Sequence, residues 1–191
     1  AFRPFAGIGW VLHYAPVAYA LDRMATETGL SSPDVSVPFG GNWRLGFVSG
    51  FFGGIGFGGV VSVVDPALLR VTIPAIYGVG PPGDVILGWV VHVMHAAVLG
   101  IAFAAVVGLT GRSGASAREQ IGEALLFSLA VWLVLAAIAL PLWIAVASPR
   151  SLPVPYISNT MLAGHLAYGM VMGTIYYAFD APAEPPGRAE H

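Results

Sequence analysis

The chain has 191 residues, of which 57% are apolar and only 9% are charged. Soluble domains carry roughly 25% charged residues, so this chain has too few charges to cover a surface in contact with water. The composition predicts an integral membrane protein whose main surroundings are the lipid bilayer.

Two missing residue types exclude several kinds of site. The chain has no cysteine, which excludes thiolate-bound iron–sulfur clusters, thiolate zinc sites, disulfides and covalent c-type haem. All eight basic residues are arginine, so there is no lysine for retinal, pyridoxal phosphate or a phosphate-binding loop. The net charge of −2 is small and there is no basic run, so a nucleic-acid partner is not expected.

The composition of residues 1–43 predicts one helix followed by a polar loop. Residues 5–21 have about the minimum length of a membrane span, although they contain His13 and Pro16. The preceding Arg3 and the following Ala18-Tyr-Ala20 also resemble a secretory signal with its cleavage site. We expect a helix that crosses the bilayer or lies in its interface, with a helix outside the bilayer as the alternative.

Four later segments are each long and apolar enough to cross a bilayer as a helix, which takes about 20 residues. They are residues 45–64, 85–109, 121–147 and 160–179. Residues 180–191 are rich in proline and charge, which predicts a disordered tail. The predicted fold is an all-α membrane bundle of four transmembrane helices within residues 44–179, with the N-terminal helix as a fifth.

The arginines predict how this bundle is oriented in the membrane, because cytoplasmic loops are enriched in basic residues. One side of the four spans carries Arg44, Arg112, Arg118 and Arg188, and the other carries Arg70 and Arg150. We therefore expect a multi-pass protein of the cell membrane whose 110–120 loop and C-terminus face the cytoplasm.

Two helical hairpins, about 44–110 and 120–179, resemble each other. Each contains an arginine, then Pro-x-x-Tyr, and then a histidine followed by glycine eight residues later and an aromatic residue eleven residues later. The histidines are His92 and His165. The pattern predicts parallel repeats related by an axis along the membrane normal, with both histidines at a similar depth.

Small residues recur every four positions along three of the predicted helices, which lets helices approach closely in lipid. These helix-packing residues are Gly46, Gly50, Gly54, Gly58, Ala96, Gly100, Gly169 and Gly173. The stripe from Gly46 to Gly58 is longer than one bundle needs. It therefore also favours a homo-oligomer or contact with other membrane subunits.

His92 and His165 share helix faces with these glycines, so we expect both to point into the bundle. One hypothesis makes them the axial ligands of a haem b, with Arg70 and Arg150 pairing with its propionates. The alternative is a His–His or His–Tyr hydrogen bond that ties two helices together. Close packing of alanine and glycine leaves little room for a macrocycle and favours this alternative.

A metal site formed by His92, His95 and His165 is a further hypothesis. His95 lies one turn from His92, and several methionines lie near these histidines; His and Met together suit copper(I). Methionine is also an ordinary gap-filler in membrane helices. The only acid inside a predicted span is Glu123, so the carboxylate of a zinc hydrolase is missing and an enzyme is not favoured.

Three short segments resemble small multi-pass membrane proteins of the YagU-like type, including haloarchaeal members. They are Ile73-Pro-Ala-Ile-Tyr-Gly78, Gly88-Trp-Val-Val-His92 and Ala163-Gly-His-Leu166, and the similarity covers roughly residues 44–179. The resemblance implies a helical membrane fold and no settled chemistry, so it supplies no catalytic residue.

Three functions remain open from the sequence. The first is a non-catalytic structural or accessory subunit, for example of a respiratory membrane complex. The second is a redox protein with haem b or a metal bound by His92 and His165. The third is a transporter for a small molecule or copper, although the scarcity of polar residues inside the spans disfavours an ion-coupled carrier.

Overall fold

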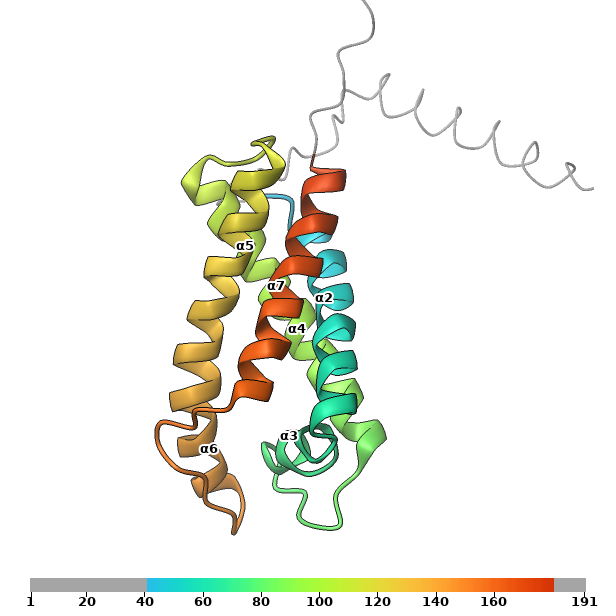
Figure 1. The fold of residues 1–191 in the computed structure, drawn as a ribbon, viewed down its shortest axis with the longest axis vertical. Coiled ribbons are helices and arrows are strands. Elements are labelled where there is room, and N and C mark those ends of the chain that lie inside the picture. The colour runs from blue at the N-terminus through green and yellow to red at the C-terminus, as the bar shows by residue number, and fades with distance from the viewer. Residues whose placement is uncertain (1–40, 181–191) are drawn as a thin grey trace, which may run out of the picture. The chain divides into compact units, whose positions relative to one another are not determined.

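The computed structural model describes residues 41–180, and every regular element among them is a helix, as predicted (Figure 1). The elements are α2 (Trp43–Val64), η1 (Leu68–Thr72), α3 (Ile73–Ala75), α4 (Val85–Thr110), α5 (Ala117–Val131), η2 (Trp132–Ala139), α6 (Leu140–Ala147) and α7 (Asn159–Phe179). Both η1 and η2 are π-helical. The predicted N-terminal helix and C-terminal tail lie outside the described residues.

Polar side chains mark where the long helices begin. Asn42 accepts a hydrogen bond from the backbone N–H of Leu45, and Asp84 accepts from two amides of the first turn of α4. Ser116 and Glu119 form a capping box at α5, and Ser158 caps α7. Each cap satisfies amides that have no partner within the helix. The observed helices therefore begin within four residues of the predicted apolar segments.

Three of the described helical stretches are long and apolar enough to cross a membrane: Trp43–Val64, Val85–Thr110 and Ala117–Ala147. The last combines α5, η2 and α6. At 1.5 Å per residue its 31 residues would extend about 46 Å, more than the roughly 30 Å of hydrocarbon. Helix α7 has 21 residues but is less apolar, so the predicted count of four spans stays a prediction.

Helix α7 packs along both α2 and α5, while α4 packs mainly on α2 (Figure 1). The predicted repeat would map α2 onto α5 and α4 onto α7. That symmetry requires an α4–α5 contact as extensive as the α2–α7 contact, but α4 and α5 touch only slightly. The helix contacts do not follow the proposed symmetry, and the repeat rests on the sequence pattern alone.

The predicted packing residues lie where helices meet. A Cβ atom on Gly50 would lie 2.5 Å from the carbonyl oxygen of Ala96 and 2.7 Å from Cα of Gly100. On the other side of the bundle, a Cβ on Gly173 would lie 2.6 Å from Cβ of Ala124. Glycine thus permits close backbone approach between α2 and α4 and between α7 and α5. The stripe from Gly46 to Gly58 faces α4 within the chain, so it is not a free surface for a second copy.

Helix α7 runs antiparallel to the α5–η2–α6 stretch, as hydrogen bonds at both ends show. Beyond the C-terminal end of α7, Asp180 Oδ2 accepts from the backbone N–H of Gly114 (2.9 Å) and from Nε2 of Gln120 (2.7 Å). Before its N-terminal end, the backbone N–H of Tyr156 donates to the carbonyl of Ala137 in η2 (2.7 Å). These contacts place residue 180 and the 110–120 loop at the same end of the bundle.

Candidate functional site: a histidine cavity

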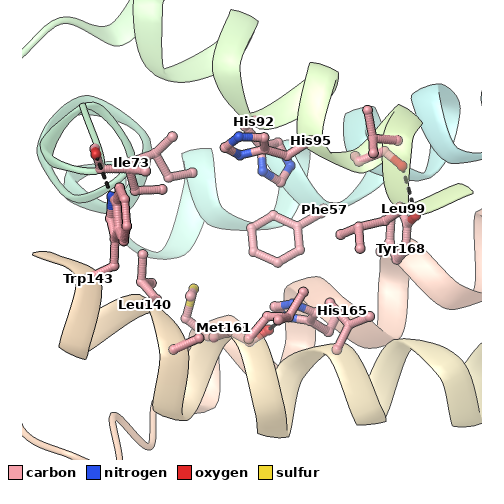
Figure 2. Close-up of a pocket in the computed structure, with 17 residues that line it drawn as sticks. Phe57, Ile73, His92, His95, Leu99, Leu140, Trp143, Met161, His165 and Tyr168 are labelled. Carbon is pink, nitrogen blue, oxygen red and sulfur yellow. Dashed lines mark hydrogen bonds between the residues drawn. The ribbon is translucent and has the colours of Figure 1, made fainter. Parts of the chain in front are cut away.

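A cavity of about 530 Å³ lies within the bundle, between α4, η2, α6 and α7 (Figure 2). Seventeen residues line it, including His92, His95 and His165, and it is called the histidine cavity below. Apart from these imidazoles, the Tyr168 hydroxyl and the Trp143 indole N–H, its lining side chains are apolar. Its volume is within the range of small-molecule sites in proteins, roughly 300–1,000 Å³.

The cavity exists because α4 does not pack closely against α5 or η2, although α2 and α7 hold both sides of the bundle together. The η2 segment borders this space with Ala136 and Ala139, whose short side chains leave the volume open. A π-helical turn is an unusual element that recurs at functional sites. The gap is thus a consequence of helix arrangement and small side chains together.

The cavity opens sideways between α4 and η2. Val98 on α4 is 61% exposed and Leu135 on η2 is 44% exposed, and both line the cavity. At one end Trp143 Nε1 donates to the carbonyl of Ile76 (2.8 Å), which connects α6 to the segment after α3 (Figure 2). In a bilayer, such an opening would face lipid.

His92 is held by α2. Its Nε2 donates to the carbonyl oxygen of Gly54 (3.0 Å), and its ring lies 4.5 Å from the ring of Phe57, measured between centroids. The small residues of α2 bring its backbone within reach of this imidazole. His92 therefore forms an interhelical hydrogen bond, but to a backbone carbonyl and not to the histidine or tyrosine side chain predicted as the alternative to haem ligation.

His165 is buried and bonds within its own helix. Its Nδ1 donates to the carbonyl of Met161 (2.7 Å), one turn earlier in α7. Its own carbonyl accepts a hydrogen bond from the hydroxyl of Ser128, which connects α7 to α5. The bond to Met161 fixes the ring orientation while leaving Nε2 free of partners among the described residues.

His95 lies nearer the surface. Its Nε2 is 2.9 Å from the hydroxyl of Tyr77, a residue that is 60% exposed. The Pro-x-x-Tyr segment of the first hairpin therefore contacts the helix that carries both His92 and His95. Tyr77 is thus a hydrogen-bond partner of this histidine as well as a surface residue.

The structure brings His92 and His165 to one cavity but separates them by an aromatic ring. Phe57 lies between them, with its centroid 4.5 Å from that of His92 and 4.9 Å from that of His165 (Figure 2). A bis-histidine haem needs the porphyrin plane in that position, between the two imidazoles. Because the ring of Phe57 occupies that position, these residues do not fit a haem in this arrangement.

The other predicted ligands are not gathered around the histidines. Arg70 and Arg150 do not line the cavity; Nε of Arg70 donates to the carbonyl of Pro82 (3.2 Å). Within residues 41–180, no group of three or more His, Cys, Asp or Glu side chains could hold a metal ion. His92, His95 and His165 therefore share a cavity without forming a metal-binding cluster there.

Sequence reasoning missed three aromatic residues of the cavity. Phe57 is a large side chain among the glycines of α2, and Tyr168 lies one turn after His165, donating to the carbonyl of Ala96 (2.9 Å). Trp143, on α6, is the third. The spacing of Tyr168 from His165 was a usable signal, whereas the position of Phe57 between two other helices was not encoded in any local pattern.

Comparisons of the chain with models of protein families, with curated proteins and with solved structures gave no match. The histidine cavity is therefore interpreted from its own geometry.

Proposed function

We propose that this protein binds a lipid-soluble small molecule in the histidine cavity, as a multi-pass membrane protein. The observation that carries the proposal is the cavity itself, with about 530 Å³ of apolar space and a few polar groups. Ligand sites in proteins share this composition, with an apolar lining for affinity and sparse polar groups for orientation. The three apolar helices are compatible with membrane insertion, which would give such a ligand access from lipid.

Filling the cavity tests the proposal. Ala139 lines the cavity and its side chain is exposed, so Ala139→Phe adds a ring there without overpacking the core. Ala145 is also exposed, lies on the same helical stretch and does not line the cavity, which makes Ala145→Phe the matched control. Native mass spectrometry after extraction in mild detergent would measure the co-purified ligand.

We expect the wild type and Ala145→Phe to retain the same small-molecule adduct, and Ala139→Phe to lose most of it. Equal adduct in all three proteins, or no adduct in a wild type offered membrane lipid extract, would contradict the proposal. Retention of the fold in both variants is checked by circular dichroism.

The accessory-subunit function is a second candidate, supported by the outer face of α2. The ring of Phe52 is 47% exposed there, and Val48 (45%) and Ile55 (42%) lie on the same face of the helix at positions four residues before and three residues after it. Aromatic residues are enriched where proteins meet one another. The same native mass spectra would reveal any bound protein chain. The YagU-like resemblance is compatible with both candidates and stays a proposal.

A further inference from the structure

The polar atoms that the histidine cavity offers to a ligand can be identified one by one. No Asp, Glu, Lys or Arg lines it, so it holds no charge partner for an ionic headgroup. The hydroxyl of Tyr168 donates to Ala96, the indole of Trp143 donates to Ile76, and His95 is paired with Tyr77. Nδ1 of His95 has no partner among the described residues, but His95 is exposed, so the polar groups that remain in the buried and half-buried part of the lining are the imidazoles of His92 and His165.

The hydrogen bonds of His165 determine which of its nitrogens carries the proton. A carbonyl oxygen can only accept, so Nδ1, which lies 2.7 Å from the carbonyl of Met161, must carry the hydrogen. In a neutral imidazole the other nitrogen then has a lone pair and no hydrogen. An imidazolium would have no anionic partner in this lining. His165 therefore presents Nε2 as an acceptor.

The same reasoning applies to His92 with the nitrogens exchanged. Its Nε2 donates to the carbonyl of Gly54, so Nδ1 carries the lone pair. Among residues 41–180, the side-chain nitrogen and oxygen atoms that are both buried and unpartnered are Oε1 of Gln120, Oε2 of Glu123 and Nε1 of Trp132. The free imidazole nitrogens are not in that set, although no described residue bonds to them, and both histidines line the cavity.

Two acceptors without donors favour a ligand that brings a donor of its own. A hydroxyl group supplies one, whereas a ketone, quinone or ether would place a lone pair against a lone pair. The surrounding rings of Phe57, Trp143 and Tyr168, with the imidazoles themselves, favour a flat aromatic headgroup through edge-to-face and stacked contacts.

We infer that the ligand is a neutral lipid with a phenol-type headgroup, an aromatic ring bearing a hydroxyl on an apolar tail. This inference rests on the proposed ligand-binding function and specifies the chemistry of the same site. The hydroxyl donates to Nε2 of His165 or Nδ1 of His92, the ring lies among the aromatic side chains, and the tail extends through the opening between α4 and η2.

Matched probes test the headgroup in the wild-type protein. Binding of para-octylphenol, para-octylanisole, octylbenzene and decanol is measured by native mass spectrometry from lipid nanodiscs. The anisole differs from the phenol only by a methyl group on the oxygen, which removes the donor. We expect the phenol to bind about tenfold more tightly than the anisole, the difference that one hydrogen bond makes, and more tightly than decanol.

Equal binding of phenol and anisole would overturn the donor-based recognition and leave the proposed function intact. Decanol binding as tightly as the phenol would overturn the aromatic headgroup. If none of the four probes bound, both this inference and the proposed function would fail.

A pair of variants assigns the acceptor. His165→Phe keeps a ring in place and removes Nε2, and Ala145→Phe, which lies outside the cavity lining, is the control. We expect His165→Phe to reduce the phenol-to-anisole ratio several-fold with anisole binding unchanged, and Ala145→Phe to leave the ratio unchanged. An unchanged ratio in His165→Phe would contradict the assignment to His165, and the probe series in the wild type decides the headgroup even if a variant fails to fold.

Discussion

At Gly50, a single added carbon atom would be enough to separate helices α2 and α4. Gly50 faces Gly100 across the α2–α4 contact, and a Cβ there would lie 2.5 Å from the carbonyl oxygen of Ala96. Gly50→Ala must therefore push two backbones apart, and we expect it to lower the free energy of unfolding by about 1–3 kcal/mol, the usual cost of overpacking.

Gly59 on the same helix provides the control, because an added Cβ would meet nothing within 4 Å. Gly59→Ala should leave thermal stability in detergent unchanged or slightly raised, since alanine favours helix more than glycine does. Equal melting temperatures for Gly50→Ala and Gly59→Ala would show that the α2–α4 contact is looser than described.

Residue types and their spacing predicted part of the site. An imidazole in an apolar helix that shares its face with small residues should point inward, and both His92 and His165 line the cavity. The ring of Phe57 between them could not be predicted, because spacing along one helix contains no information on what a third helix inserts. The same limitation left the pairing of His95 with Tyr77 unforeseen.

At the scale of elements, apolar runs located the long helices, since this signal is local. The π-helical segments η1 and η2 were not predicted. An apolar segment has the same composition whether each carbonyl accepts a hydrogen bond from the amide four residues later, as in an α-helix, or five residues later, as in a π-helix. Thus the helices could be predicted while the shape between them could not.

The hydrogen bond from Trp143 to the carbonyl of Ile76 connects α6 to the segment after α3 beside the cavity. Trp143→Phe removes the donor and keeps an aromatic ring. We expect a loss of about 1 kcal/mol in the free energy of unfolding, typical of one hydrogen bond, and faster amide exchange in residues 73–79. Trp43→Phe, at a similarly exposed tryptophan of α2, should not accelerate exchange there. Unchanged exchange in Trp143→Phe would mean that this connection does not restrain the segment.

At the scale of the whole molecule, the absence of native cysteine makes the orientation directly measurable. Ser113 and Ser151 are exposed and lie at opposite ends of the α5–η2–α6 stretch. We expect a membrane-impermeant maleimide to label Ser151→Cys on intact cells and Ser113→Cys only after the membrane is opened, as the arginine bias indicates. The opposite labelling pattern would reverse the predicted orientation.

The lateral opening of the histidine cavity between α4 and η2 has a consequence for how affinity is read. A ligand arriving through this opening is drawn from the bilayer, where an apolar compound accumulates far above its concentration in water. Occupancy then depends on the mole fraction of ligand in the membrane, and a modest intrinsic affinity suffices for a filled site. Suppose that the ligand concentration is expressed per volume of water. The same protein would then give different dissociation constants in concentrated and dilute suspensions of the same vesicles. Expressed as a mole fraction of ligand in the lipid, the data would give a single constant.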